Sequence, residues 1–224
     1  MKIQKENLQK PKAVLFDWDG TLVNTNGIYK NLLHETLKEL GIESWDREAA
    51  EKYRFYSRRQ ALPLIFGDKW QEINDHYVYK VRAASQNNII PFSQSSKLLE
   101  HLKQENIVMS VVSNKEGNVL RSEVKTLGWE CYFHKVIGAT DASNDKPAAD
   151  PARLALQGIN ISNEEEVWFL GDSIVDVQCA NAVGGIPILL VSDTDISKQI
   201  QYLTIPHVRV HSHEEIIMMH KQLK

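Results

Sequence analysis

Short apolar runs alternate with stretches of helical periodicity through most of this 224-residue chain. Each run is bounded by glycine, proline or polar residues, which is typical of a buried strand. Strands that alternate with helices imply a parallel sheet covered by helices on both faces. The sequence therefore predicts an α/β fold with a Rossmann-like, doubly wound parallel sheet. The predicted strands span residues 13–16, 108–112, 136–137, 167–170, 186–191 and 208–210, and the predicted helices span 98–105, 119–127, 151–158, 175–183 and 214–223.

The segment after the first predicted strand has a different pattern. Residues 24–90 contain helical periodicity, with leucines at helical spacing that end at Gly41, but no convincing strand. Further helix-compatible stretches in this segment span residues 46–56 and 68–84. We therefore predict an inserted α-helical domain over residues 24–90. The α/β core would then comprise residues 1–23 and 91–224.

The charge and the cysteines of the chain narrow the class of partner. The 26 basic and 29 acidic residues are interspersed, so we expect no nucleic acid partner. No apolar stretch reaches membrane-spanning length and the N-terminal residues lack an apolar leader, so we expect a cytoplasmic protein with no membrane partner. Cys131 and Cys179 lack the spacing of a metal site or a disulfide framework, and we interpret both as reduced core residues.

Two aspartates follow the first predicted strand: Asp17 and Asp19, separated by Trp18. In an extended segment residues i and i+2 share a face, so both side chains can reach one small substrate or one metal ion. In open parallel sheets, ligands bind just beyond the carboxyl ends of the strands. An acidic turn that merely caps the strand is the alternative interpretation, and the other strand ends must decide between the two.

Side chains that can carry chemistry also follow three later strands, and loops that converge at one edge should carry related chemistry if the site is real. Alone, each of these side chains has an ordinary role as a helix cap, a turn residue or a solvated charge. Together they place a hydroxyl, an amide, an ammonium group and two carboxylates at the same edge of the sheet. They are Ser113 and Asn114, then Lys146, then Asp172 and Asp176.

The order of these motifs resembles the haloacid dehalogenase superfamily. The motifs are Asp-x-Asp-Gly-Thr-Leu, strand-Ser-Asn, Lys-Pro and Gly-Asp-Ser-x-x-Asp, and they cover residues 12–191. Within that superfamily the chain is most similar to phosphoglycolate-phosphatase-like hydrolases, and the insertion resembles their helical cap. The resemblance implies a Mg²⁺-dependent phosphatase that hydrolyses a small phosphorylated metabolite through an aspartyl-phosphate intermediate.

The acidic residues predict a metal site. Converging carboxylates would repel a phosphate dianion, so a hard divalent cation is required. Mg²⁺ is typically held by one or two carboxylates plus the substrate phosphate, which matches Asp17 and Asp172. By resemblance, the backbone carbonyl of Asp19 completes the protein ligands, and Asp176 lies behind them and holds a metal-bound water or Lys146.

The catalytic roles follow as a hypothesis. Asp17 would attack the phosphorus, while Asp19 would protonate the leaving oxygen and later deprotonate the hydrolytic water. A carboxylate at the position of Asp19 favours phosphoester chemistry, because the dehalogenases and phosphonatases of the superfamily lack it. Charge on the phosphoryl oxygens would be neutralised by Lys146, the Ser113 hydroxyl, and backbone N–H groups near Trp18 and Asn114.

Some features of the sequence stay open. In the insertion, Arg54 and Arg58 lie among aromatic residues, which suits recognition of a second anionic group on the substrate, although a solvated or packing role is the alternative for each. Asp145 directly precedes Lys146 and departs from the usual family pattern. A phosphosugar mutase on the same scaffold is the second functional reading, and a non-catalytic binding protein is the third.

Overall fold

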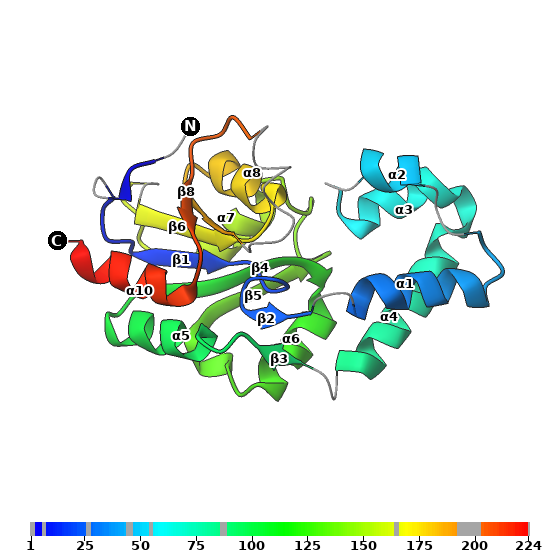
Figure 1. Ribbon diagram of the computed structural model, residues 1–224, viewed down its shortest axis with the longest axis horizontal. Coiled ribbons are helices and arrows are strands. Elements are labelled where there is room, and N and C mark those ends of the chain that lie inside the picture. Colours follow the sequence, from blue (N-terminus) through cyan, green and yellow to red (C-terminus); the bar gives the residue numbers. More distant parts are fainter. Residues whose placement is uncertain are drawn as a thin grey trace.

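A six-stranded parallel sheet forms the centre of the molecule in our computed structural model. The structure describes residues 3–5, 8–25, 28–43, 47–53, 56–85, 89–163, 166–191 and 203–223. Within them the strand order is β5-β4-β1-β6-β7-β8 (Figure 1). The strands are β1 (Ala13–Phe16), β4 (Val108–Glu116), β5 (Phe133–Ala139), β6 (Val167–Gly171), β7 (Ile186–Leu190) and β8 (Val208–Val210).

Helices cover both faces of this sheet, because successive side chains of a strand point to opposite faces. Phe16 of β1 lies in a core cluster with residues of α5, α6 and α10, whereas the adjacent Leu15 lies in a second cluster with residues of α7 and α8. The predicted α/β, doubly wound parallel sheet is therefore confirmed. The helices are α5 (Ser95–Gln104), α6 (Gly117–Thr126), α7 (Asp150–Leu156), α8 (Ile174–Ala182) and α10 (His213–Gln222), with the short 3-10 helix η3 (Glu130–Tyr132) after α6.

The end of β4 differs from the prediction. The strand continues past Val112 to Glu116, and its pairing with β5 shifts register between these two residues. Ser113 and Asn114 therefore lie in the irregular end of the strand, not in a loop after it. An irregularity of this kind bends a strand and re-aims its side chains, which apolar periodicity alone does not reveal.

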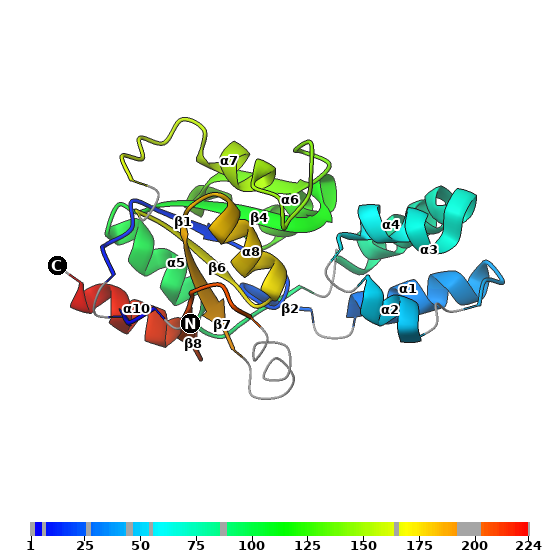
Figure 2. The same ribbon diagram turned by 90° about the horizontal axis from the view of Figure 1, so that it is seen from above.

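In the described part of the segment between β1 and α5, four α-helices form a separate group beside the sheet, which lies on the right of Figure 1 and Figure 2. They are α1 (Ile28–Glu39), α2 (Arg47–Lys52), α3 (Arg58–Phe66) and α4 (Trp70–Ser85), with the 3-10 helix η2 (Gly67–Lys69) before α4. Buried Leu37, Leu62 and Ile73 form a core cluster of this group. Tyr77 and Val81 of α4 pack against Val119 of α6, which is one of the contacts between this group and the sheet layers.

Two short strands lie where the chain leaves and re-enters the sheet layers. β2 (Val23–Asn24) pairs antiparallel with β3 (Ile90–Pro91). Helix α3 and this strand pair were not predicted. Pro63 lies inside α3, and a run of two residues is too short to show a strand period.

The two cysteines differ in exposure. Cys179 is buried, but Cys131 is exposed, so the interpretation of Cys131 as a core residue is wrong. The cause is its position in η3, where no residue is buried. Both thiols are free. Among the described residues, none of the helices has both the length and the apolar character that crossing a membrane requires.

Candidate active site

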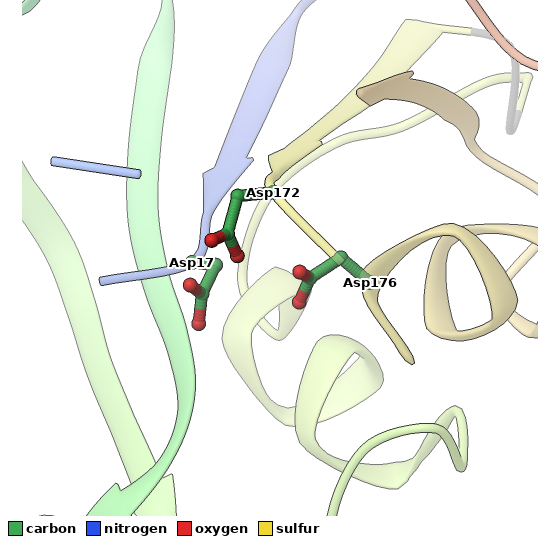
Figure 3. A group of neighbouring side chains, drawn as sticks. All are labelled: Asp17, Asp172 and Asp176. Atoms are coloured by element: carbon green, nitrogen blue, oxygen red, sulfur yellow. The ribbon is translucent and has the colours of Figure 1, made fainter. Parts of the chain in front are cut away.

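Three carboxylates meet at the point where the strand order reverses around β1. Asp17 follows β1, Asp172 follows the neighbouring strand β6, and Asp176 lies in the first turn of α8. Figure 3 shows their carboxylates turned toward one another, and one oxygen of each lies within 4.8 Å of the others. Such a reversal point is where open α/β sheets bind ligands.

Residues close in sequence to Asp172 and Asp176, together with Gly20, position these two carboxylates. Ser173 caps α8: its hydroxyl accepts from the Asp176 backbone N–H, and the Asp176 carboxylate accepts from the Ser173 backbone N–H at 3.0 Å. Gly20 has a φ of +81°, and a Cβ on it would lie 2.1 Å from Asp172 Oδ2. Only glycine therefore leaves room for Asp172 at this turn.

Lys146 sits between two of the carboxylates. Its Nζ donates to Asp17 Oδ1 at 2.6 Å and to Asp176 Oδ1 at 2.7 Å, and the residue is 3% exposed. The Asn114 side chain holds the Lys146 backbone, accepting from its N–H at 2.9 Å and donating to its carbonyl at 3.0 Å. The Asn114 amide is thus bonded to the lysine loop.

Burial and mutual repulsion disfavour charge on this cluster. Burial, with the Asp176 charge adding to it and Lys146 opposing it, raises the pKa of Asp17 to about 7. Burial and the Asp17 and Asp176 charges raise the pKa of Asp172 to about 8. Burial alone would lower the pKa of Lys146, but its two carboxylate partners outweigh that and raise the pKa above its ordinary value. Converging oxygen donors that hold protons near neutral pH suit a hard divalent cation.

Asp19 is paired with a different lysine from Asp17 and Asp176. Its Oδ1 accepts from Lys115 Nζ at 2.8 Å. Lys115 also donates to Glu123 Oε2 at 2.6 Å and to the Tyr29 hydroxyl at 3.0 Å. Burial raises the pKa of Asp19, and the Lys115 charge works against that rise. The acidic side chain at this position is therefore held by a buried lysine.

The sequence did not reveal Lys115, Glu123 or Tyr29. Glu123 is fully buried, and its Oε2 also accepts from Trp18 Nε1 at 2.6 Å. A signal did exist for Lys115, which directly follows the Ser-Asn pair in the sequence. The sequence contained no such signal for Glu123, because a charged residue on a helix is ordinarily solvated.

Most of the candidate residues line one cavity of about 390 Å³, whereas the Trp18 side chain is fully buried in the core beside it. Ser113 is 4% exposed, and its Oγ accepts from the Lys115 backbone N–H at 3.2 Å. Arg58 reaches the cavity from α3: its guanidinium lies 4.3 Å from the centre of the Tyr77 ring, and its Nε donates to Asn74 Oδ1 at 3.2 Å. Arg54 lies outside the described residues. The cavity is also lined by Asp17, Asp19, Asn114, Lys115, Lys146, Asp172 and Asp176.

Comparison with known proteins defines the class. Residues 14–191 match the haloacid dehalogenase-like hydrolase family. The chain therefore belongs to the haloacid dehalogenase-like hydrolases. A crystal structure of a hydrolase of this superfamily from Ehrlichia chaffeensis is 30% identical, with a TM-score of 0.67, over 97% of this chain and 99% of that one.

Curated relatives carry phosphatase names. The phosphoglycolate phosphatase of Aquifex aeolicus is 28% identical over 177 residues, which cover 77% of this chain and 81% of that protein. The pyrophosphatase PpaX of Listeria monocytogenes serotype 4a is 27% identical over 180 residues, which cover 75% of this chain and 78% of that protein. Both are enzymes that act on phosphate bonds.

Proposed function

We propose that the chain is a Mg²⁺-dependent phosphatase that hydrolyses a small phosphomonoester metabolite through an aspartyl-phosphate intermediate. The position of Asp17 carries this proposal. Its carboxylate faces the cavity, its Oδ1 lies 2.6 Å from Lys146 Nζ, and it neighbours the carboxylates of Asp172 and Asp176. A nucleophile oriented by an ammonium group, beside oxygen donors for a cation, suits attack on phosphorus.

The donor set fits magnesium. Asp17 and Asp172 would supply carboxylate oxygens, and the backbone carbonyl of Asp19 would be the third protein ligand. When bound, Mg²⁺ supplies positive charge that offsets both the carboxylates and the phosphoryl oxygens. Asp176, which accepts from Lys146 and from the N-terminus of α8, would keep the lysine in place.

The reaction needs two displacements at phosphorus. In the first, an Asp17 oxygen bonds to phosphorus, the bond to the ester oxygen breaks, and Asp19 gives that oxygen a proton. In the second, water bonds to phosphorus, Asp19 takes its proton, and inorganic phosphate leaves Asp17. Lys146, the Ser113 hydroxyl and the backbone N–H groups near Trp18 and Asn114 would offset charge on the phosphoryl oxygens.

The cavity indicates a small substrate with a second anionic group. A volume of about 390 Å³ suits a metabolite, and Arg58 lines this cavity from α3, in the helix group α1–α4. An arginine packed on an aromatic ring is well suited to a carboxylate or a phosphate. Phosphorylated hydroxy acids and sugar phosphates are therefore the compounds to assay first.

The test is release of inorganic phosphate from p-nitrophenyl phosphate and a panel of phosphorylated metabolites with Mg²⁺. We expect Asp17→Asn to lower kcat by about 10³-fold or more. Asp75→Asn, the same change at an exposed position of α4, is the control and should keep full activity. Borohydride reduction of acid-quenched enzyme would convert an aspartyl phosphate to homoserine, and mass spectrometry should find this conversion at Asp17.

Other outcomes would overturn the proposal. A sugar 1-phosphate converted to the 6-phosphate without free phosphate would identify a mutase. An Asp17→Asn protein as active as the wild type would exclude the covalent route. No turnover of any compound, together with tight binding of one, would identify a binding protein.

A further inference from the structure

Asp145, directly before the active-site lysine, is a buried carboxylate with one oxygen unpaired. The residue is 3% exposed. Its Oδ1 lies 3.1 Å from the Arg59 Nη2 atom. Within the described part of the chain, its Oδ2 is buried and has no hydrogen-bond partner. A buried acceptor without a donor lowers stability, so this arrangement needs a physical reason.

The partner of Asp145 comes from the other part of the molecule. Arg59 lies in the first turn of α3, within the helix group α1–α4, and its Nη2 also donates to the Ser143 carbonyl at 3.3 Å. A guanidinium carries a planar fork of N–H groups that matches both oxygens of a carboxylate. Here Arg59 pairs with only one of them. The ion pair is therefore half formed.

The neighbouring residue links this pair to the cavity. Arg58 lines the cavity, while Arg59, next along the same turn, faces Asp145. A capping box between Ser57 and Gln60 fixes that turn, so the two arginines move together. A displacement of α3 toward bound substrate would carry Arg59 toward the free Oδ2.

The other side of the lysine loop is already fixed. Asn114, at the end of β4, makes two hydrogen bonds with the Lys146 backbone, at 2.9 and 3.0 Å. The segment that carries Lys146 is thus held from the sheet by Asn114 and from α3 by the Arg59–Asp145 pair. A movement of α3 would therefore move the loop that carries Lys146, and Lys146 in turn contacts the Asp17 carboxylate.

We propose that Arg59 and Asp145 form a latch, which becomes bidentate when the α1–α4 group closes over substrate and which fixes the Lys146 loop for catalysis. Both are positioning residues, because neither lines the cavity. The expected effect on kcat rests on the proposed phosphatase function, whereas the pairing of Arg59 with both oxygens of Asp145 on closure does not. The orphaned oxygen of Asp145 is then the acceptor that closure satisfies.

The first test needs no turnover. Hydrogen–deuterium exchange of the ligand-free protein should show faster exchange in residues 141–146 for Arg59→Gln and for Asp145→Asn than for wild type. Addition of Mg²⁺ and inorganic phosphate should slow exchange of α3 in wild type but not in either variant. Arg82→Gln is the matched control, because Arg82 of α4 forms an ion pair with Glu116 of β4 at 3.6 Å but has a 55% exposed side chain.

The second test is a double-variant cycle with p-nitrophenyl phosphate. We expect Arg59→Gln and Asp145→Asn each to lower kcat by about tenfold, with KM changed much less, and the double variant to be no worse than either. Arg82→Gln should stay within about twofold of wild type. If the double variant loses the product of the two single-variant losses in kcat, the latch proposal is wrong. It is also wrong if hydrogen–deuterium exchange of residues 141–146 is unchanged in both single variants. A wild-type protein without phosphatase activity would reject the proposed function and leave the exchange result to decide on the latch.

Discussion

Replacing Glu123 by glutamine tests the buried charge network most directly. Glu123 is fully buried, and its carboxylate accepts from Trp18 Nε1 at 2.6 Å, from Lys115 Nζ at 2.6 Å and from the Tyr29 hydroxyl at 2.8 Å. Glutamine keeps the shape and one acceptor oxygen but removes the negative charge. Lys115 would then keep only Asp19 as its ionic partner.

The size of the effect follows from burial. Removing one partner of a buried ion pair costs about 3–5 kcal/mol. Because Lys115 retains Asp19, we expect the lower end, ~3 kcal/mol of the free energy of unfolding. For a chain of 224 residues this corresponds to a fall in Tm of about 6–12 °C.

Urea unfolding followed by circular dichroism measures this loss. Glu72→Gln, at an exposed position of α4, is the control and should change the free energy of unfolding by less than about 0.5 kcal/mol. Adding Lys115→Met to Glu123→Gln should lower the free energy of unfolding further, because it would leave the Asp19 carboxylate without its ammonium partner. A loss below about 1 kcal/mol for Glu123→Gln would refute the reasoning.

Three further predictions concern the cation, the turn before it and the histidines. Gly20→Ala should abolish stabilisation by Mg²⁺ in thermal unfolding, since its Cβ would displace Asp172; an unchanged Mg²⁺ effect would contradict this. The raised pKa values of Asp17 and Asp172 mean that, without cation, stability falls as pH rises from the ordinary carboxyl value of about 4 through about 7 to 8, so the Tm increase caused by Mg²⁺ should grow across that interval and vanish at low pH. Burial lowers the pKa of His101 and His220, so urea unfolding should show stability falling as pH drops below about 6.5, and less steeply in His220→Phe.

Local patterns predicted the features of the fold that depend on neighbouring residues. The bounds of β1 and β8 match the predicted runs, because a buried parallel strand is a continuous apolar segment. Asp17 and Asp172 could be placed together because parallel strands end at one edge. Tertiary pairing, by contrast, decides that β4 continues to Glu116, since its last residues pair with β5 across a register shift.

The charged part of the site was harder to predict. Lys115 and Glu123 are buried because each satisfies the other, and sequence alone gives no measure of such pairing. The same holds for Asp145, which the sequence marked as unusual but whose partner Arg59 lies in a different part of the chain. Lys146 is also buried by distant partners, but it was found because it belongs to a motif, whereas Lys115, Glu123 and the partner of Asp145 were not.

The net charge of the cavity affects the binding of the cation, the binding of the substrate and the position of helix α3. Within the described part of the chain, five carboxylates at or beside the cavity lie near the two ammonium groups of Lys115 and Lys146, so full ionisation leaves negative charge in excess. The five are Asp17, Asp19, Glu123, Asp172 and Asp176. A phosphate dianion would meet repulsion there until a divalent cation binds. Among the described residues that line the cavity, Arg58 adds a further positive group and comes from α3, so approach of this helix would add positive charge and would carry Arg59 onto the second oxygen of Asp145.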